Sequence, residues 1–288
     1  MIYFHELATS ALLRRAVMEA VGVGAICGAL GAHVVLRRLS FFTVTISHAT
    51  FPGVVIASIL GASLFLGGAV TALAVVVAVG IVGSQRRLDS STATGVVLAG
   101  AFALGVLLLS AQPRATTDLT SFLVGSLLTV SNGDLAVTSV VAVVVVAVMS
   151  ALHKELVLGA FDREGAEALG FRPLWLDLAV LTLVAITVVT AVPAVGTILV
   201  VALLVTPALT ARLWTERIGS MMVLGAALGA LSGFVGLWVA TQARIAAGAS
   251  VVLVSSALLA LSLAARGARR TSVYGRPGRP DVSSFGSL

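Results

Sequence analysis

Charged residues are scarce in this sequence. Only 10% of its 288 residues are Asp, Glu, Lys or Arg, whereas a soluble domain carries about 25%. Hydrophobic residues make up 59% of the chain, and the mean hydropathy is +1.12. This composition excludes a soluble globular domain and predicts an all-α polytopic membrane protein, embedded in the lipid bilayer through helices of ~20 residues.

The chain also lacks the motifs of an enzyme. Its single cysteine, Cys27, lies in an apolar run, so the chain forms no intrachain disulfide. No GxxxxGK(S/T) phosphate loop occurs, and the single lysine, Lys154, lies outside any glycine-rich turn. HExxH, CxxC and Ser-His-Asp patterns are missing as well. We therefore expect no ATP hydrolysis or other catalysis by this chain, and no bound cofactor.

Nine apolar runs are long enough to cross a bilayer as helices. Only a glycine-containing bend at 61–68 separates the second run from the third, and if either is re-entrant, eight crossings remain. We predict nine. The runs lie at 13–36, 44–62, 66–83, 91–111, 135–152, 174–194, 197–213, 220–241 and 249–265.

The basic residues predict the orientation of these spans. Alternating spans place most Lys and Arg side chains on one side of the membrane, and the positive-inside rule makes that side the cytoplasm. The N-terminus is then outside and the C-terminus inside. Cytoplasmic loops also account for the net charge of +6, which therefore does not indicate nucleic acid as a partner. We predict a transmembrane domain at 1–265 and a basic, disordered cytoplasmic tail at 266–288.

His48 lies inside one of the predicted spans. It belongs to SHATFPG (47–53), which opens an apolar run just ahead of Pro52. An ionisable side chain in a membrane helix is costly unless it has a partner, which makes His48 a functional-site hypothesis. A histidine that only forms a hydrogen bond with a neighbouring carbonyl is the alternative.

The inner segment at 153–173 contains a short charged helix. Asp162 is a favourable N-cap residue, and Gly170 ends the helix ahead of Pro173. Between these ends, Glu164 and Glu167 lie one turn apart. A solvated helix of this kind is suited to docking a soluble partner, although a plain solvated loop has the same composition.

Six segments resemble, in order and in spacing, the membrane permease subunits of ABC-type importers for zinc, manganese and iron, also called the metal-chelate permease family. The resemblance covers residues 11–265. The segments are GALGAHVVLRRLS (28–40), SHATFPG (47–53), STATGVVLAGAFALGVLLLS (91–110), DLTSFLVGSLLTVS (118–131), FDREGAEALGF (161–171) and VGTILVVALLVTPALTARL (195–213).

This resemblance implies the permease subunit of an ATP-driven importer in the cytoplasmic membrane. Its implied cargo is a divalent metal cation, and ATP is bound by a cytoplasmic ATPase subunit. The resemblance further implies an extracytoplasmic solute-binding protein that delivers the metal, and a permease that is a homodimer or is paired with a second permease. The segment at 161–171 matches the family's ATPase-coupling region, which assigns that role to Asp162, Arg163, Glu164, Glu167 and Gly170.

The metal site implied by the resemblance is incomplete in this sequence. The family carries an Asp four residues before the histidine, so that both side chains share one helical face, but that position is Val44 here. His48 is retained. Ser47 and Thr45 nearby, or Asp118 from the outer segment, are the candidate replacements for the carboxylate. Without that carboxylate, the imidazole favours zinc over manganese or iron.

Two other functions compete with the importer. An ion-coupled secondary transporter would need carboxylates inside the membrane, and the chain has few ionisable residues in its predicted spans. A membrane anchor that transports nothing is the second alternative. The ionisable residues concerned are Glu19, His33, His48 and Asp177.

Overall fold

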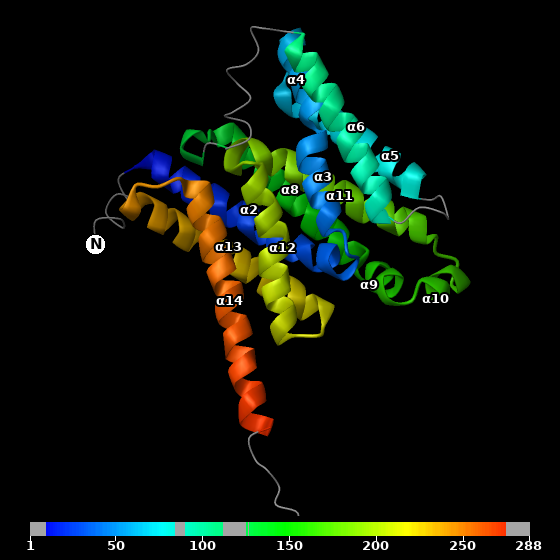
Figure 1. Cartoon of the computed structure of the whole chain (residues 1–288), viewed down its shortest axis with the longest axis vertical. Coiled ribbons are helices and arrows are strands. Elements are labelled where there is room, and N and C mark those ends of the chain that lie inside the picture. Colours follow the sequence, from blue (N-terminus) through cyan, green and yellow to red (C-terminus); the bar gives the residue numbers. More distant parts are fainter. Residues whose placement is uncertain (1–9, 84–89, 112–124, 126, 275–288) are drawn as a thin grey trace, which may run out of the picture.

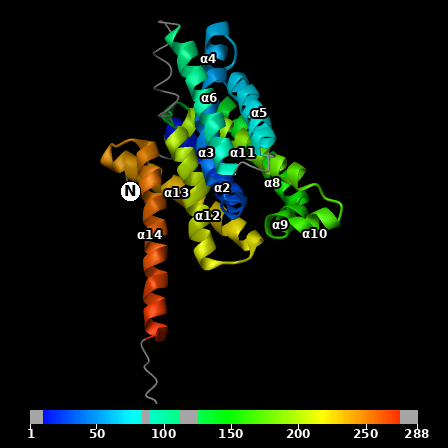
Figure 2. The same cartoon turned by 45° about the vertical axis from the view of Figure 1, so that its right-hand side comes forward.

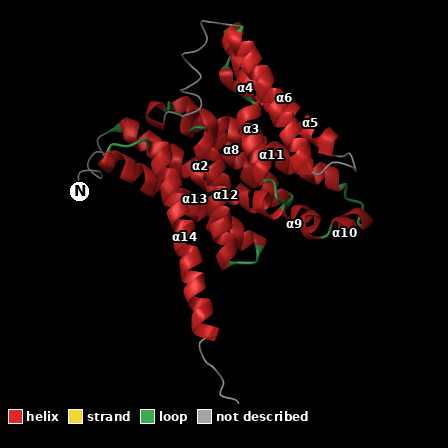
Figure 3. Ribbon diagram, in the orientation of Figure 1, coloured by secondary structure: helices red, strands yellow, loops and turns green. Residues whose placement is uncertain are grey.

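Helices make up most of the described part of the chain. The computed structural model describes residues 10–83, 90–111, 125 and 127–274. These residues form α-helices and one 3₁₀ turn, η1 (Leu127–Thr129), with no strand among them (Figure 3). The all-α prediction is confirmed.

Nine candidate spans within the described residues are long and apolar enough to cross a membrane, which confirms the predicted number (Figure 1). The helices concerned are α2 (Ala11–Leu36), α3 with α4 (Ser40–Ala49 and Phe51–Leu60), α5 (Leu64–Gly83), α6 (Ser90–Ser110), α8 (Asn132–Ala151), α11 (Pro173–Val195), α12 (Thr197–Trp214), α13 (Ile218–Ala243) and α14 (Ala247–Tyr274). The predicted orientation, with the N-terminus outside, stays a prediction.

The second span consists of two helices rather than one. Thr50 stands between α3 and α4 as the C-cap of the first and the N-cap of the second. Pro52 lies in the first turn of α4, where its missing N–H leaves no helical hydrogen bond unmade. At the far end, Gly61 adopts a left-handed conformation (φ 64°) and ends α4. The glycine bend therefore separates two candidate spans, Ser40–Leu60 and Leu64–Gly83, and both are included in the nine.

Two predicted boundaries differ from those observed by four residues or more. α3 begins at Ser40 rather than at 44, and α14 continues to Tyr274 rather than ending at 265. Figures 1 and 2 both show the lower half of α14 standing apart from the other helices. The remainder of the predicted tail, 275–288, lies outside the described residues.

Small residues bring α2 and α13 into backbone contact. The two helices run antiparallel, so that Gly28 faces Gly225, Gly24 faces Gly229 and Ala20 faces Gly233. A Cβ atom added to Gly28 would lie 2.0 Å from the carbonyl oxygen of Gly225. Close approach through small residues stabilises helix pairs in lipid, where the hydrophobic effect cannot drive their association.

We expect Gly28→Ala to destabilise the protein by about 1–3 kcal/mol, because the added methyl group meets a backbone oxygen that cannot rotate away. Thermal unfolding of the protein in detergent measures this. Gly22→Ala in the same helix is the matched control, since nothing lies within 4 Å of the atom that it adds. Equal unfolding temperatures for the two variants would show that the α2–α13 contact is not limiting for stability.

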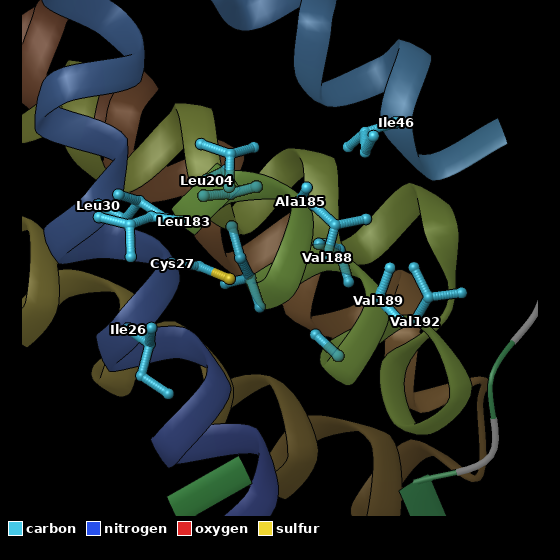
Figure 4. Packing of buried hydrophobic residues seen from close by; sticks show 14 of the residues in the cluster. Ile26, Cys27, Leu30, Ile46, Leu183, Ala185, Val188, Val189, Val192 and Leu204 are labelled. Carbon is cyan, nitrogen blue, oxygen red and sulfur yellow. The ribbon is translucent and has the colours of Figure 1, made fainter. Parts of the chain in front are cut away.

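A buried apolar core holds α3 against the centre of the molecule. Figure 4 shows Ile46 of α3 opposite Leu204 of α12 and Ala185 of α11, with Cys27 and Leu30 of α2 beyond them. Ile46, Leu30 and Leu204 are each 0% exposed. The helix that carries His48 is therefore fixed on its inner side by packing.

Candidate functional site

His48 lies in the last turn of α3, directly before the break in the second span. Its side chain is half-buried. Its imidazole meets the ring of Phe102 from α6 edge-on, with 6.2 Å between ring centroids and an interplanar angle of 85°. Phe51, the first residue of α4, stacks on the same Phe102 ring at 6.0 Å. The imidazole thus contacts one ring of α6, and Phe51 beyond the helix break packs on that same ring.

Val44 shares a helical face with His48. The two residues lie one turn apart, and both are half-buried. The position at which the resembling family has a carboxylate is therefore open to the same surroundings as the imidazole. An apolar side chain there leaves His48 as the only ionisable group of that turn.

The candidate oxygen ligands beside His48 point into the core. Thr45 is 0% and Ser47 is 1% exposed. The Ser47 hydroxyl donates a hydrogen bond to the carbonyl oxygen of Thr43 at 2.8 Å. The Thr45 hydroxyl oxygen has no hydrogen-bond partner among the described residues. Because both side chains are buried, the structure brings neither hydroxyl to the partly exposed face of His48. Asp118 lies outside the described part of the chain.

No group of three or more His, Cys, Asp or Glu side chains capable of holding a metal ion occurs among the residues that the structure describes. The two remaining buried ionisable groups of the spans lie on α2. Glu19 accepts a hydrogen bond of 2.7 Å from Thr138 of α8, and both ring nitrogens of His33 are buried without a partner in the described structure. Within this part of one chain, His48 does not belong to a closed cation site.

The predicted docking helix is present at the edge of the molecule. α9 (His153–Phe161) and α10 (Arg163–Ala168) form a bent pair at the periphery (Figures 1 and 2). Asp162 caps α10 by accepting a hydrogen bond of 2.8 Å from the N–H of Gly165. Gly170, at φ 85°, ends it through a hydrogen bond from its N–H to the Glu167 carbonyl. Glu164 and Glu167 are exposed, as predicted for a solvated helix.

Two large apolar side chains beside α10 were not predicted as site residues. Phe161 is 69% exposed at the end of α9, and Leu169 is 68% exposed just after α10. Both belong to the segment FDREGAEALGF (161–171). Their placement at the two ends of a charged run was the signal available in the sequence.

The contacts of Arg37 were also not predicted from the sequence. This residue caps the C-terminus of α2, and its guanidinium forms an ion pair with Asp177 of α11 through Nη1 and Oδ1. Its Nη2 donates a hydrogen bond of 3.0 Å to the carbonyl oxygen of Leu156 in α9. Arg37 therefore links the end of α2 to the helix that precedes the docking helix.

Comparison with known proteins shows the family of this chain. The family model described as "ABC 3 transport family" matches residues 9–266. The manganese transport system membrane protein MntC of Listeria monocytogenes is 35% identical over 256 residues, which cover 89% of this chain and 91% of that protein. The zinc transport system membrane protein TroC of Treponema pallidum is 33% identical over 261 residues, covering 87% and 88%.

A solved structure has the same fold. PsaBC from Streptococcus pneumoniae, in complex with a Fab, aligns with a TM-score of 0.81 and 32% sequence identity. The alignment covers 91% of this chain and 95% of the chain to which it aligns. The arrangement of helices described above is therefore also that of the aligned PsaBC chain.

Proposed function

We propose a metal-import function from the premise that the chain belongs to the ABC 3 transport family. The chain is a multi-pass membrane permease of an ABC-type metal transporter. The proposed cargo is a divalent transition metal, manganese or zinc, which enters the cytoplasm at the expense of ATP. ATP is bound and hydrolysed by a partner subunit, and the permease itself has no resident cofactor.

The position of His48 carries the cargo proposal. A half-buried imidazole at a break in a membrane helix offers one nitrogen lone pair to a passing cation. Imidazole suits zinc, whereas manganese prefers carboxylate and other oxygen ligands. Ligand chemistry therefore favours zinc, while the relatives are named for manganese as well as zinc. Uptake of the two metals has to be compared directly.

The proposed importer contains three further components. A cytoplasmic ATPase subunit docks on α9 and α10, and an extracytoplasmic solute-binding protein delivers the metal. A second copy of this chain forms a homodimer, so that the cation meets a second His48 imidazole. Weak ligation at this position is compatible with transport, because a permeating ion must leave the site as readily as it enters.

Reconstitution of the permease with its ATPase subunit and binding protein in lipid vesicles tests the function. We expect ATP-dependent accumulation of manganese or zinc, and no accumulation with ADP. ATP-independent uptake driven by an ion gradient would instead identify a secondary transporter. Absence of uptake of either metal, with an intact complex, would favour a membrane anchor and contradict the proposal.

We expect Val44→Asp to tighten metal binding and to widen the accepted metals toward manganese. The new carboxylate would lie one helical turn before the imidazole, about 5–6 Å away between Cβ atoms, and would supply the oxygen ligand that manganese prefers. Competition of unlabelled zinc against radioactive manganese during uptake measures the change. Val44→Asn, which adds bulk without charge, is the matched control, and an equal effect of both variants would contradict the ligand assignment.

The predicted orientation is tested by single cysteines in a Cys27→Ala background. Ser63, exposed between α4 and α5, is predicted outside, and Glu216, exposed between α12 and α13, is predicted inside. We expect a membrane-impermeant maleimide to label Ser63→Cys in intact cells and Glu216→Cys only after permeabilisation. The reverse labelling pattern would invert the orientation of all spans.

A further inference from the structure

The guanidinium of Arg37 joins three helices in a buried position. The Arg37 side chain is only 6% exposed. One of its terminal nitrogens pairs with the carboxylate of Asp177 on α11, and the other donates a hydrogen bond to the main chain of α9 at Leu156. Both terminal nitrogens of the planar guanidinium therefore have partners on other helices, and these contacts hold α2, α9 and α11 in fixed positions relative to one another.

Helix α9 lies directly against this group. A Cβ atom added to Gly159 would lie 3.7 Å from Nη2 of Arg37 and 3.0 Å from a methyl carbon of Leu176 on α11. Leu156 on the same helix is 0% exposed. A displacement of α9 therefore moves the oxygen that Arg37 binds, because no flexible side chain stands between them.

The other end of this connection is α3. Arg38, the residue after Arg37, is in the left-handed conformation (φ 58°). The N–H of Leu39 then donates 2.8 Å to the carbonyl of Val34, and α3 starts at Ser40. A turn this short, closed by its own hydrogen bonds, transmits movement of Arg37 to the base of the helix that carries His48.

We propose that Arg37 is a positioning residue that couples movement of the docking helices α9 and α10 to movement of α3 and its metal-facing side. This inference rests on the proposed function. A buried ion pair adds little stability compared with apolar side chains of the same size, so its value here is geometric. Metal transport and ATP hydrolysis can be measured separately. Loss of a coupling residue lowers the amount of metal moved per ATP, whereas loss of a purely structural residue lowers both rates together.

Arg37→Lys is the first test. The ammonium still faces Asp177, so no buried charge is left uncompensated, but a point donor cannot reproduce the fork that also holds Leu156. We expect the complex to assemble and hydrolyse ATP at nearly the normal rate, while metal moved per ATP falls by about tenfold, a size usual for coupling between sites. Arg212→Lys, at the exposed end of α12, is the matched control.

A second variant removes the link without leaving a charge unpaired. Arg37→Met combined with Asp177→Leu replaces the ion pair by apolar side chains, a change that is often neutral for stability. We expect the same loss of metal moved per ATP and an unfolding temperature near that of the original protein. Transport and ATP hydrolysis that fall in parallel, in proportion to folded complex, would assign Arg37 a purely structural role and overturn the inference.

A third measurement does not depend on the cargo. In a Cys27→Ala background, the labelling rate of Val44→Cys reports the exposure of the His48 face of α3. We expect ATP to change this rate in the complex with native Arg37 and to leave it unchanged with Arg37→Lys. A response to ATP that survives Arg37→Lys would overturn the inference. If no metal is moved but the native complex responds to ATP and the variant does not, the cargo proposal fails and the coupling role stands.

Discussion

His48→Ala should reduce metal uptake by about tenfold or more, because even the partners that merely orient a metal ligand change metal affinity by about 10–100-fold when they are removed. The substitution leaves Val44 and two buried hydroxyls around the position, and none of these replaces the lost lone pair. Initial rates of ATP-dependent uptake into vesicles, for manganese and for zinc, measure the effect.

The fold should survive this substitution. The His48 side chain is half-buried, and its ring contact is with Phe102, which is itself 44% exposed. Copurification of the ATPase subunit and an unchanged unfolding temperature are the controls. Normal uptake by His48→Ala would reduce the imidazole to a packing partner of Phe102, and Asp118 would become the next candidate ligand.

The hydroxyl candidates can be separated from the imidazole by their own variants. Ser47→Ala removes a group whose proton already goes to the Thr43 carbonyl, and Thr45→Val removes a hydroxyl buried in the core. A cation at the half-exposed face of His48 would touch neither. This follows from their burial, since Thr45 is 0% and Ser47 is 1% exposed. Thr45 lies about one helical turn from His48, so spacing along the helix alone did not exclude it.

The number of spans could be predicted because lipid imposes a minimum length on every apolar run. The helix ends could not, because hydropathy marks only the part of a helix that lies in lipid. α14 continues past 265 through Arg266 and Arg269 to Tyr274, since backbone hydrogen bonds do not require apolar side chains. α3 starts at Ser40 because the short turn at Arg38 leaves no room for a longer connection.

Contacts between distant segments were beyond the reach of sequence patterns. Arg37 could be read as the end of an apolar run, but its partners lie 119 and 140 residues further along the chain. The glycine spacing on α2 and α13 likewise predicts close packing without naming the partner helix. His48 could be found from sequence alone because a polar group in lipid is conspicuous, whereas the Phe102 ring that orients it belongs to another apolar run.

Variants of the predicted docking helix α10 and its flanking residues can show how much of the affinity for the ATPase subunit comes from apolar side chains and how much from charged ones. Phe161 and Leu169 flank α10 and are more than half exposed, although exposure of such side chains to water is costly. Glu164 and Glu167 between them are exposed carboxylates. At interfaces, buried apolar anchors set the dissociation rate, while charges at the rim mainly set the association rate and its salt dependence.

Phe161→Ala combined with Leu169→Ala should therefore weaken binding of the ATPase subunit by about 100-fold or more, since burial of each side chain contributes roughly 1.5–3 kcal/mol. Glu164→Lys with Glu167→Lys should instead slow association and lose its effect at high salt. Surface-bound permease in detergent or nanodiscs, exposed to purified ATPase subunit at two salt concentrations, gives both rate constants. Ile198→Ala, 74% exposed at the opposite end of the spans, is the control. If the apolar double variant binds normally and the charge reversals abolish binding at every salt concentration, the carboxylates carry the docking, and Phe161 and Leu169 contact lipid headgroups instead.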